Sequence, residues 1–188
     1  MQKEGGTKMN TMKLIRRVTM GILSGNPQNE PMHYGEVFSL WNYVMTANKT
    51  IADTQMSINH TGDNDLKKLL TEVIEAAQSE VKQVSEILKA NGVALPPASP
   101  EPPSVELNDI PVGARFPDVD VAATASMGLA TGLVTCSQIM GQSIREDIAM
   151  MFGQFHVAKA ALAGKFLKLT KEKGWLIPPP LHHSKTEE

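Results

Sequence analysis

Hydrophobic side chains recur every three or four positions over two long blocks in the first half of the chain. In residues 31–59 six side chains carry the repeat: Val37, Leu40, Trp41, Val44, Ile51 and Ile58. In residues 64–91 seven side chains carry it: Leu66, Leu70, Val73, Ala77, Val81, Val84 and Leu88. Because this spacing places apolar residues along one side of a helix, the pattern predicts two amphipathic helices with these bounds.

Polar and conformationally special residues mark where these helices begin and end. Asp63 suits the N-cap of the second helix, since its carboxylate can accept backbone N–H bonds. Asn91 and Gly92 supply a C-terminal stop, and Pro31 suits the first turn of the first helix, where its missing N–H costs nothing. A short turn between two long helices indicates an antiparallel hairpin.

A second hairpin is predicted in the second half of the chain. Proline is absent between Pro117 and Pro178, a stretch too long for one helix of ordinary length. Gly141 can end a helix in the left-handed conformation, and Ser143 with Glu146 matches the capping box that starts another. The second half therefore contains two further predicted helices: 119–140 and 144–173.

The connection between the two hairpins is rich in proline. Seven of the 12 prolines fall between Pro96 and Pro117, within residues 93–117. A hairpin connection needs only a handful of residues, whereas this stiff segment can run along a bundle about 40 Å long at about 3.1 Å per residue. The predicted fold is all-α: a ferritin-like four-helix bundle with one long Pro-rich crossover between helices two and three. A flexible linker inside an up-and-down bundle is the alternative.

The predicted bundle leaves a segment at each end of the chain. The parts are an N-terminal extension (1–29), the four-helix bundle (30–177) and a C-terminal tail (178–188). Residues 9–23 of the extension mix apolar and basic side chains. They are compatible with a short helix that docks on the bundle, on a second subunit or on a membrane surface.

Charge and composition argue against several classes of protein. Lys and Arg number 18 and Asp and Glu 20, and this near balance is unlike a nucleic-acid binder. Residues 121–144 are uncharged, but Thr, Ser, Gln and Gly dilute them, so a buried helix is favoured over a membrane span. A single cysteine, Cys136, and the lack of a signal-peptide pattern indicate synthesis in the cytoplasm.

A ferritin-like bundle raises the question of a carboxylate-bridged di-metal site. Such a site takes a Glu from each of two helices and a Glu-x-x-His pattern from each of the other two. The chain offers one such pattern in its predicted bundle, Glu30 with His33, and no carboxylate lies between Val121 and Ile144. The sequence therefore predicts no di-metal site and no cofactor.

A smaller metal site is conceivable at the end of the bundle where the first helix begins. Counting turns from that end places four side chains at a similar height: Glu36, Glu86, Cys136 and Asp147. His33 with Glu36 and Asp147 has the donor set that a single zinc, iron or manganese ion accepts. In the alternative interpretation, His33 caps the helix and the acids are solvated or paired with Arg145.

The remaining reactive side chains suggest no catalytic arrangement. Cys136 lies in an uncharged helix, without the base and electropositive surroundings of a catalytic thiol, so we expect it in the core. We expect His156 to be half-buried and hydrogen-bonded within the bundle, and His60 to lie at the C-terminal end of the first helix. The sequence predicts no enzymatic activity.

Small and flexible side chains suggest two kinds of contact. Gly128 and Gly132 form a small-residue face with Ala125, which fits either tight core packing or a subunit contact. Flexible methionines suggest a cavity for a small apolar ligand between the helices. The residues concerned are Met45, Met127 and Met151.

Several short strings of sequence resemble one bacterial family. They are Asn59-His60-Thr61 with Asp63, the segments 66–70, 113–116, 143–147 and 171–176, and the run Pro178–Pro180. Over about residues 30–181 the chain is similar to a ferritin-like family of Bacillus-type endospore formers, related to spore coat protein F, whose members are often labelled spore coat proteins. The resemblance implies a four-helix bundle and brings no catalytic or metal-binding residues.

The leading hypothesis is a structural or interaction protein associated with sporulation. It would act through its helix faces, as a homo-oligomer or with other coat proteins, in the spore coat after synthesis in the cytoplasm. A metal-binding ferritin-like protein with a partial site at one end of the bundle is the first alternative. A carrier of a small apolar ligand is the second.

Overall fold

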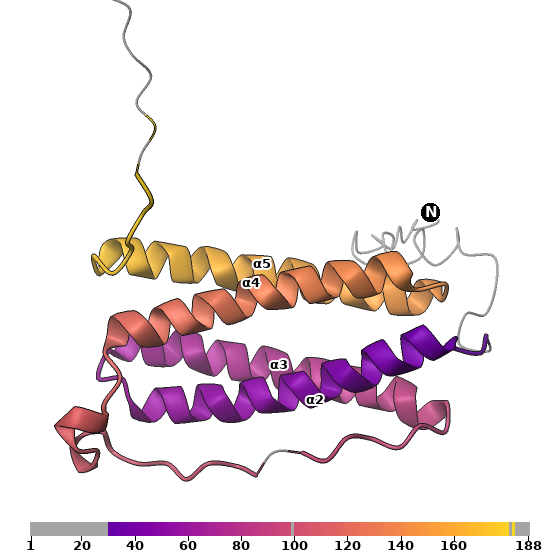
Figure 1. The fold of residues 1–188 in the computed structure, drawn as a ribbon, viewed down its shortest axis with the longest axis horizontal. Helices are drawn as coiled ribbons and strands as arrows, with labels where there is room; N and C mark the ends of the chain where they lie inside the picture. Colours follow the sequence, from indigo (N-terminus) through magenta and orange to yellow (C-terminus); the bar gives the residue numbers. More distant parts are fainter. Residues whose placement is uncertain (1–29, 99, 181, 183–188) are drawn as a thin grey trace, which may run out of the picture.

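Four long helices make up most of the computed structural model, which describes residues 30–98, 100–180 and 182 (Figure 1). They are α2 (Tyr34–Asn59), α3 (Asn64–Ala90), α4 (Asp118–Gln142) and α5 (Glu146–Glu172). No β-strand occurs in these described ranges. The expectations for residues 1–29, including a helix over 9–23, fall outside the described residues.

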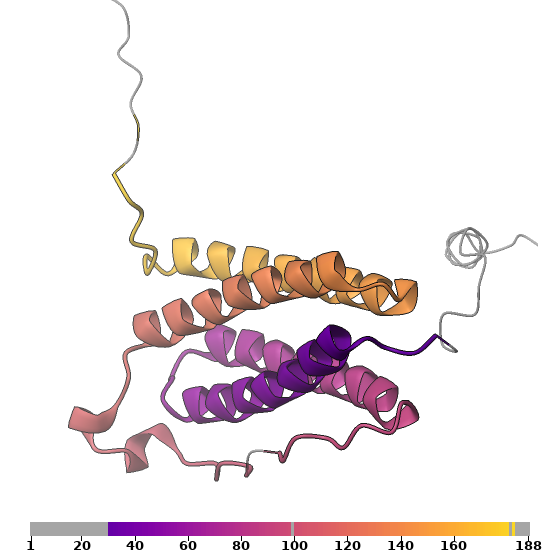
Figure 2. The ribbon, with the colours of Figure 1, turned by 45° about the vertical axis from the view of Figure 1, so that its right-hand side comes forward.

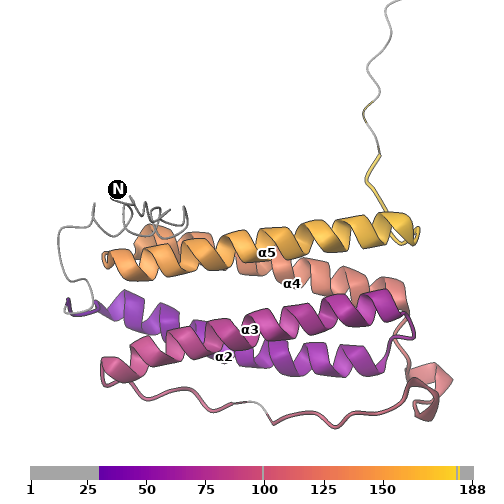
Figure 3. The same cartoon turned by 180° about the vertical axis from the view of Figure 1, so that it is seen from behind.

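The helices pair as two antiparallel hairpins, α2 with α3 and α4 with α5, which stack as two layers (Figures 1 and 2). Helix α2 lies against α4, and α3 lies against α5. Residues 93–98 and 100–117, here called the strap, run back along the outside of α2 and α3 before α4 begins at the far end (Figure 3). The prediction of an all-α four-helix bundle with one long Pro-rich crossover is confirmed.

Side chains of α2 hold the strap in place. The indole Nε1 of Trp41 donates to the carbonyl of Ala94 (3.1 Å). The amide of Asn59 donates to the carbonyl of Pro103 (3.0 Å) and accepts from the N–H of Val105 (3.2 Å). Two short 3₁₀ turns, Leu107–Asp109 and Val112–Ala114, then lead the strap into α4. The strap is therefore an ordered part of the fold and not a free linker.

Helix α2 begins three residues later than the sequence predicts. Its N-cap is His33, whose Nδ1 accepts from the N–H of Gly35 (3.0 Å), while the Glu36 carboxylate accepts from the N–H of His33 (3.1 Å). This reciprocal pair is a capping box with histidine in the place usually taken by Ser or Thr. Pro31 thus precedes the cap and does not lie in the first turn.

The turn between α4 and α5 also differs from the prediction. Helix α4 continues through Gly141, and Ser143 Oγ donates to the carbonyl of Ile139 (2.7 Å). The N-cap of α5 is Arg145, so Ser143 and Glu146 form no capping box. A carboxylate from α2, described below, bonds the backbone at this turn and replaces the local cap. By contrast, Gly92 lies at the predicted C-terminal stop of α3 and adopts the left-handed conformation, with φ 72°.

Two buried apolar clusters fill the bundle, one toward each end. The cluster nearer His33 includes Leu40, Val44, Val84, Ile148 and Phe152. The cluster nearer the α2–α3 turn includes Leu66, Leu70, Ala122, Leu162 and Phe166. The buried charged side chains lie at the His33 end, Glu36 and Arg145, and in the middle of the bundle, Glu80, and these positions define the candidate sites.

Candidate functional site

A buried carboxylate joins the start of α2 to the α4–α5 turn. The Glu36 residue is 2% exposed. Its Oε1 accepts from the N–H of Ile144 (2.9 Å) and of Arg145 (3.0 Å), and its Oε2 accepts from the N–H of His33. Three N–H donors and the positive end of the α5 dipole offset the cost of burying this charge.

A buried arginine completes this group, which we call the end cluster: His33, Glu36, Arg145 and Asp147. Arg145 Nε and Nη2 donate to the two carboxylate oxygens of Asp147 (3.0 and 2.5 Å), and Nη1 donates to the carbonyl of Glu30 (3.3 Å). The Asp147 hydrogen bond raises the pKa of Arg145, against the opposing effect of burial. The bidentate pair fixes the guanidinium in place and keeps it charged.

The structure brings all three predicted metal-site residues to one end of the bundle, but their ligand atoms already have protein partners. His33 Nδ1 accepts backbone N–H bonds, and its Nε2 donates to the carbonyl of Gln142 (3.2 Å). Asp147 is occupied by Arg145. Among the described residues, no three His, Cys, Asp or Glu side chains are grouped to hold a metal ion. These contacts compete with a metal ion for the same ligand atoms. Metal binding by His33, Glu36 and Asp147 stays a prediction.

A second polar group lies in the middle of the bundle and takes one residue from each helix. We call Tyr43, Glu80, Cys136 and Lys159 the central cluster. The Tyr43 hydroxyl donates to Glu80 Oε2 (2.8 Å). Lys159 Nζ donates to both Glu80 oxygens (2.8 and 2.7 Å). The side chains of Glu80 and Lys159 are 5% and 13% exposed, so this is a nearly buried ion pair.

Burial sets the protonation of the two remaining members of the central cluster. Removal from water raises the pKa of Tyr43, and the negative Glu80 raises it further. Removal from water also raises the pKa of the Cys136 thiol. Both groups therefore stay neutral at physiological pH, and a neutral buried thiol is a poor nucleophile. Cys136 lies in the core, as the sequence predicts.

One glycine makes room for the lysine of the central cluster. A Cβ atom at Gly132 would lie 2.9 Å from Cδ and 3.2 Å from Cε of Lys159, whereas one at Gly128 would meet no atom within 4 Å. The two glycines of the small-residue pattern therefore have different surroundings. Gly132 packs against the Lys159 side chain inside the bundle, whereas Gly128 is exposed on the surface.

Glu80 and Lys159 are not among the predicted site residues, although the sequence carries a signal for both. Glu80 interrupts the apolar stripe of α3 between Ala77 and Val84, and Lys159 interrupts that of α5 between Phe155 and Leu162. Opposite charges on two apolar stripes indicate a buried pair. Counting turns selected Glu86 in place of Glu80. Glu86 is exposed, and Cys136 packs beside Tyr43 in the bundle core.

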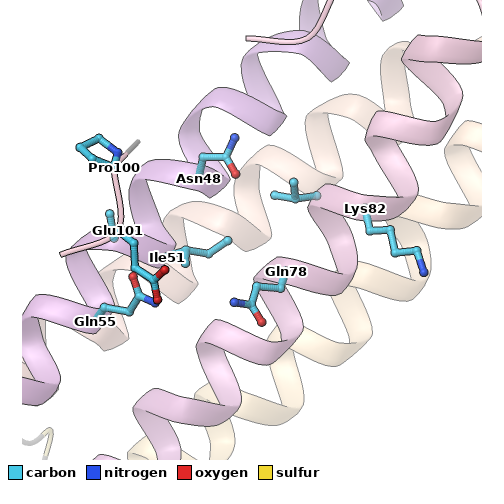
Figure 4. A pocket seen from close by; sticks show the side chains of 9 residues that line it. Asn48, Ile51, Gln55, Gln78, Lys82, Pro100 and Glu101 are labelled. Carbon is cyan, nitrogen blue, oxygen red and sulfur yellow. The ribbon is translucent and has the colours of Figure 1, made fainter. Parts of the chain in front are cut away.

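A groove of about 330 Å³ lies between α2, α3 and the strap (Figure 4). Amide side chains line much of it, over a floor that includes Ile51 and Val81: Asn48, Gln55 and Gln78. None of the three methionines proposed for a ligand cavity lines this groove. Met45 and Met127 are exposed, and Met151 is buried in the core.

Two histidines outside the end cluster, His60 and His156, lie at a helix end and on the side of the bundle core. His60 is the C-cap residue of α2, as predicted, and its Nδ1 accepts from the N–H of Phe116 at the end of the strap (3.3 Å). His156 is half-buried, as predicted, but its side chain makes no hydrogen bond to the described residues, unlike the prediction. Every buried side-chain nitrogen or oxygen in the described part of the chain has a hydrogen-bond partner.

Comparisons with known proteins agree with the resemblance seen in the sequence. A family model described as "Protein of unknown function (DUF3231)" matches residues 20–187. Uncharacterized protein YvdQ of Bacillus subtilis (strain 168) is 71% identical over 169 residues, 90% of this chain and 99% of YvdQ. A crystal structure from Bacillus halodurans C-125, described as a "putative spore coat protein", is 62% identical with a TM-score of 0.83, and the match covers 85% of this chain and 100% of that one. The chain belongs to the DUF3231 family of proteins of unknown function.

Proposed function

We propose that this protein is a structural or interaction protein of the bacterial spore coat and that it catalyses no reaction. The observation that carries the proposal is the mutual pairing of its buried polar groups. Glu36, Arg145, Glu80 and Lys159 all bond other groups of the chain, which leaves none of them as a base or nucleophile aimed at a substrate. The spore-coat description of the Bacillus halodurans relative supports the proposal.

Exposed apolar side chains support a role in protein–protein contacts. Those on the helices include Phe38, Met127, Val134 and Val157, which are 58% to 71% exposed. Large apolar side chains on a surface mark contact sites when they gather on one face. We infer that the chain is made in the cytoplasm and assembles on the spore as a homo-oligomer or with other coat proteins.

Fractionation of spores tests the proposal. The chain, carrying an epitope tag, would be expressed in a Bacillus subtilis strain that lacks YvdQ, and sporulating cells, vegetative cells and purified spores would be compared. We expect the tagged chain in the coat extract of washed spores. A tagged protein of the vegetative cytosol serves as the control for carry-over. Recovery of the chain only from the cytosol would refute a coat role.

A metal site in the end cluster is the second candidate, and the meeting of His33, Glu36 and Asp147 at one place is the observation in its favour. An ion there would have to displace Arg145 from Asp147 and backbone N–H groups from Glu36. Elemental analysis of protein purified without chelator decides the matter. A bound metal that disappears in His33→Ala would support the site. Metal-free protein, or a metal that the substitution does not remove, would refute it.

A further inference from the structure

The middle part of the outer side of the α4–α5 hairpin presents a surface without charge. Exposed residues recur every three or four positions along both helices and so lie on one side of each. We call these eight residues the α4–α5 face: Met127, Thr131, Val134, Gln138, Val157, Ala160, Gly164 and Leu167. Much of this face is apolar, although water surrounds it in the single chain.

The larger apolar side chains of the α4–α5 face are strongly exposed. Met127 is 71% exposed, Val157 69% and Val134 58%. Only 22% of the most apolar 18 residues in the segment Val112–Gln142 are buried. By length and composition alone, this segment could cross a membrane. Large exposed apolar side chains that gather on one side of a helix bundle mark an interaction site.

The strap leaves this face uncovered. It runs along the outer side of α2 and α3, on the other layer of the bundle (Figures 1 and 3). Among the described residues, the outer side of α2–α3 therefore has a covering segment of its own, and the outer side of α4–α5 has none.

We propose that the α4–α5 face binds the same face of a second copy of the chain across a two-fold axis. This inference rests on the proposed function, because it names the contact through which a coat protein would self-associate. The whole outer side of the two helices, which includes the α4–α5 face and the charged ends beyond it, measures roughly 37 Å by 20 Å, about 700 Å² per copy, and the α4–α5 face itself covers about 17 Å of each helix. A standard protein–protein interface buries about 800 Å² per partner.

The distribution of charge favours self-pairing. Because the α4–α5 face is uncharged, pairing it with itself opposes no like charges. Asp120 in the first turn of α4 carries a negative charge, and the exposed Lys168 and Lys171 near the end of α5 carry positive charges; all three flank the face at one end of the hairpin. A two-fold axis parallel to the helices lays α4 over α5 of the partner, so that each Asp120 approaches Lys171 of the partner subunit.

A lipid surface fits the α4–α5 face less well. Helices that lie on membranes carry a basic polar face and anchor with bulky aromatic residues. The face has no aromatic residue, and acidic residues stand next to it at both ends, Asp120 at one and Glu146 at the other. A second copy of the chain is therefore the occupant that its chemistry favours.

Sedimentation of the full chain tests the inference. We expect a dimer, twice the chain mass of 20.4 kDa, at concentrations up to about 100 µM, which would reveal even a weak dissociation constant. Met127→Lys and Val134→Lys each place two equal charges in the dimer contact and should weaken association at least about tenfold. Met56→Lys, at an exposed methionine of α2, is the matched control and should leave association unchanged.

The outcomes separate this inference from the proposed function. A monomer at every concentration, or a dimer weakened by Met56→Lys and not by Met127→Lys, would overturn the inference. A monomer that binds phosphatidylcholine vesicles, and loses this binding with Met127→Lys, would overturn it in favour of a membrane. Circular dichroism of each variant checks that the bundle is intact. A dimer that never reaches the spore would instead refute the proposed coat role.

Discussion

Single residues in the central cluster show how this bundle tolerates charge in its interior. Glu80 and Lys159 neutralise each other, and the Tyr43 hydroxyl supplies a further hydrogen bond. A buried pair of this kind contributes little net stability compared with an apolar pair, but loss of one partner leaves an uncompensated charge. The pair therefore constrains which helices pack together more than it stabilises them.

Lys159→Met should destabilise the protein by about 3–5 kcal/mol, because Glu80 then stays buried without its cation. The double variant Glu80→Leu/Lys159→Met should recover much of this loss. Urea unfolding followed by circular dichroism measures both. If the double variant loses as much free energy of unfolding as the two single variants together, the pair is not coupled as described.

Two glycines one helical turn apart provide a matched pair of substitutions. Gly132→Ala should cost about 1–2 kcal/mol, because the new methyl group overlaps the Lys159 side chain that Glu80 holds in place. Gly128→Ala meets open space and should stabilise α4 by about 0.5–1 kcal/mol through helix propensity. Thermal unfolding of both variants gives the comparison. Equal effects at the two positions would contradict the different surroundings of these glycines.

At the scale of the helix, local sequence signals set some ends and tertiary contacts set others. Asp63 caps α3 as predicted, accepting from the N–H groups of Asp65 and Leu66 (both 2.9 Å). The start of α5 could not be predicted from its own sequence, because Glu36, more than 100 residues away, bonds the backbone there. Capping patterns are therefore good predictors only where no distant carboxylate competes for the same N–H groups.

Glu36→Gln should destabilise the bundle by about 2–4 kcal/mol, since the amide loses the charge and turns an NH₂ group toward backbone N–H donors. Glu86→Gln is the matched control. The two glutamates have similar predicted heights, but Glu86 is exposed and its substitution should be nearly neutral. Hydrogen exchange at Ile144 and Arg145 should accelerate in Glu36→Gln only. Unchanged exchange there would contradict the role of Glu36.

The N-cap of α3 should contribute to acid unfolding. The hydrogen bond from Lys173 (2.6 Å) holds the pKa of Asp63 below its ordinary value of 3.8. Since the folded pKa is the lower one, Asp63 adds stability above about pH 4, which is lost as the pH falls through the folded value. Asp63→Asn keeps the cap and should weaken the pH dependence of stability below pH 4. Lys173→Met should weaken it in the same way, and wild-type behaviour in both would refute the linkage.

At the scale of the whole molecule, the sequence was sufficient for the topology and insufficient for the interior. The prolines between Pro96 and Pro117 predict the crossover because they make a long segment stiff, and the apolar repeats predict all four helices. Counting turns compares only how far residues lie from the helix ends, whereas burial depends on which side of the helix a residue occupies, and the apolar stripes interrupted by Glu80 and Lys159 carry that information. Counting turns led to Glu86, whereas the buried glutamate is Glu80. The two residues lie fewer than two helical turns apart on α3.

The single crossover also decides at which ends the chain enters and leaves the bundle. The described chain enters at the His33 end and leaves α5 at the opposite end, beside the α2–α3 turn (Figure 1). An up-and-down bundle of four helices would bring entry and exit to the same end. Partners attached before α2 and after α5 would therefore be held roughly 40 Å apart, and the protein would act as a spacer between two layers.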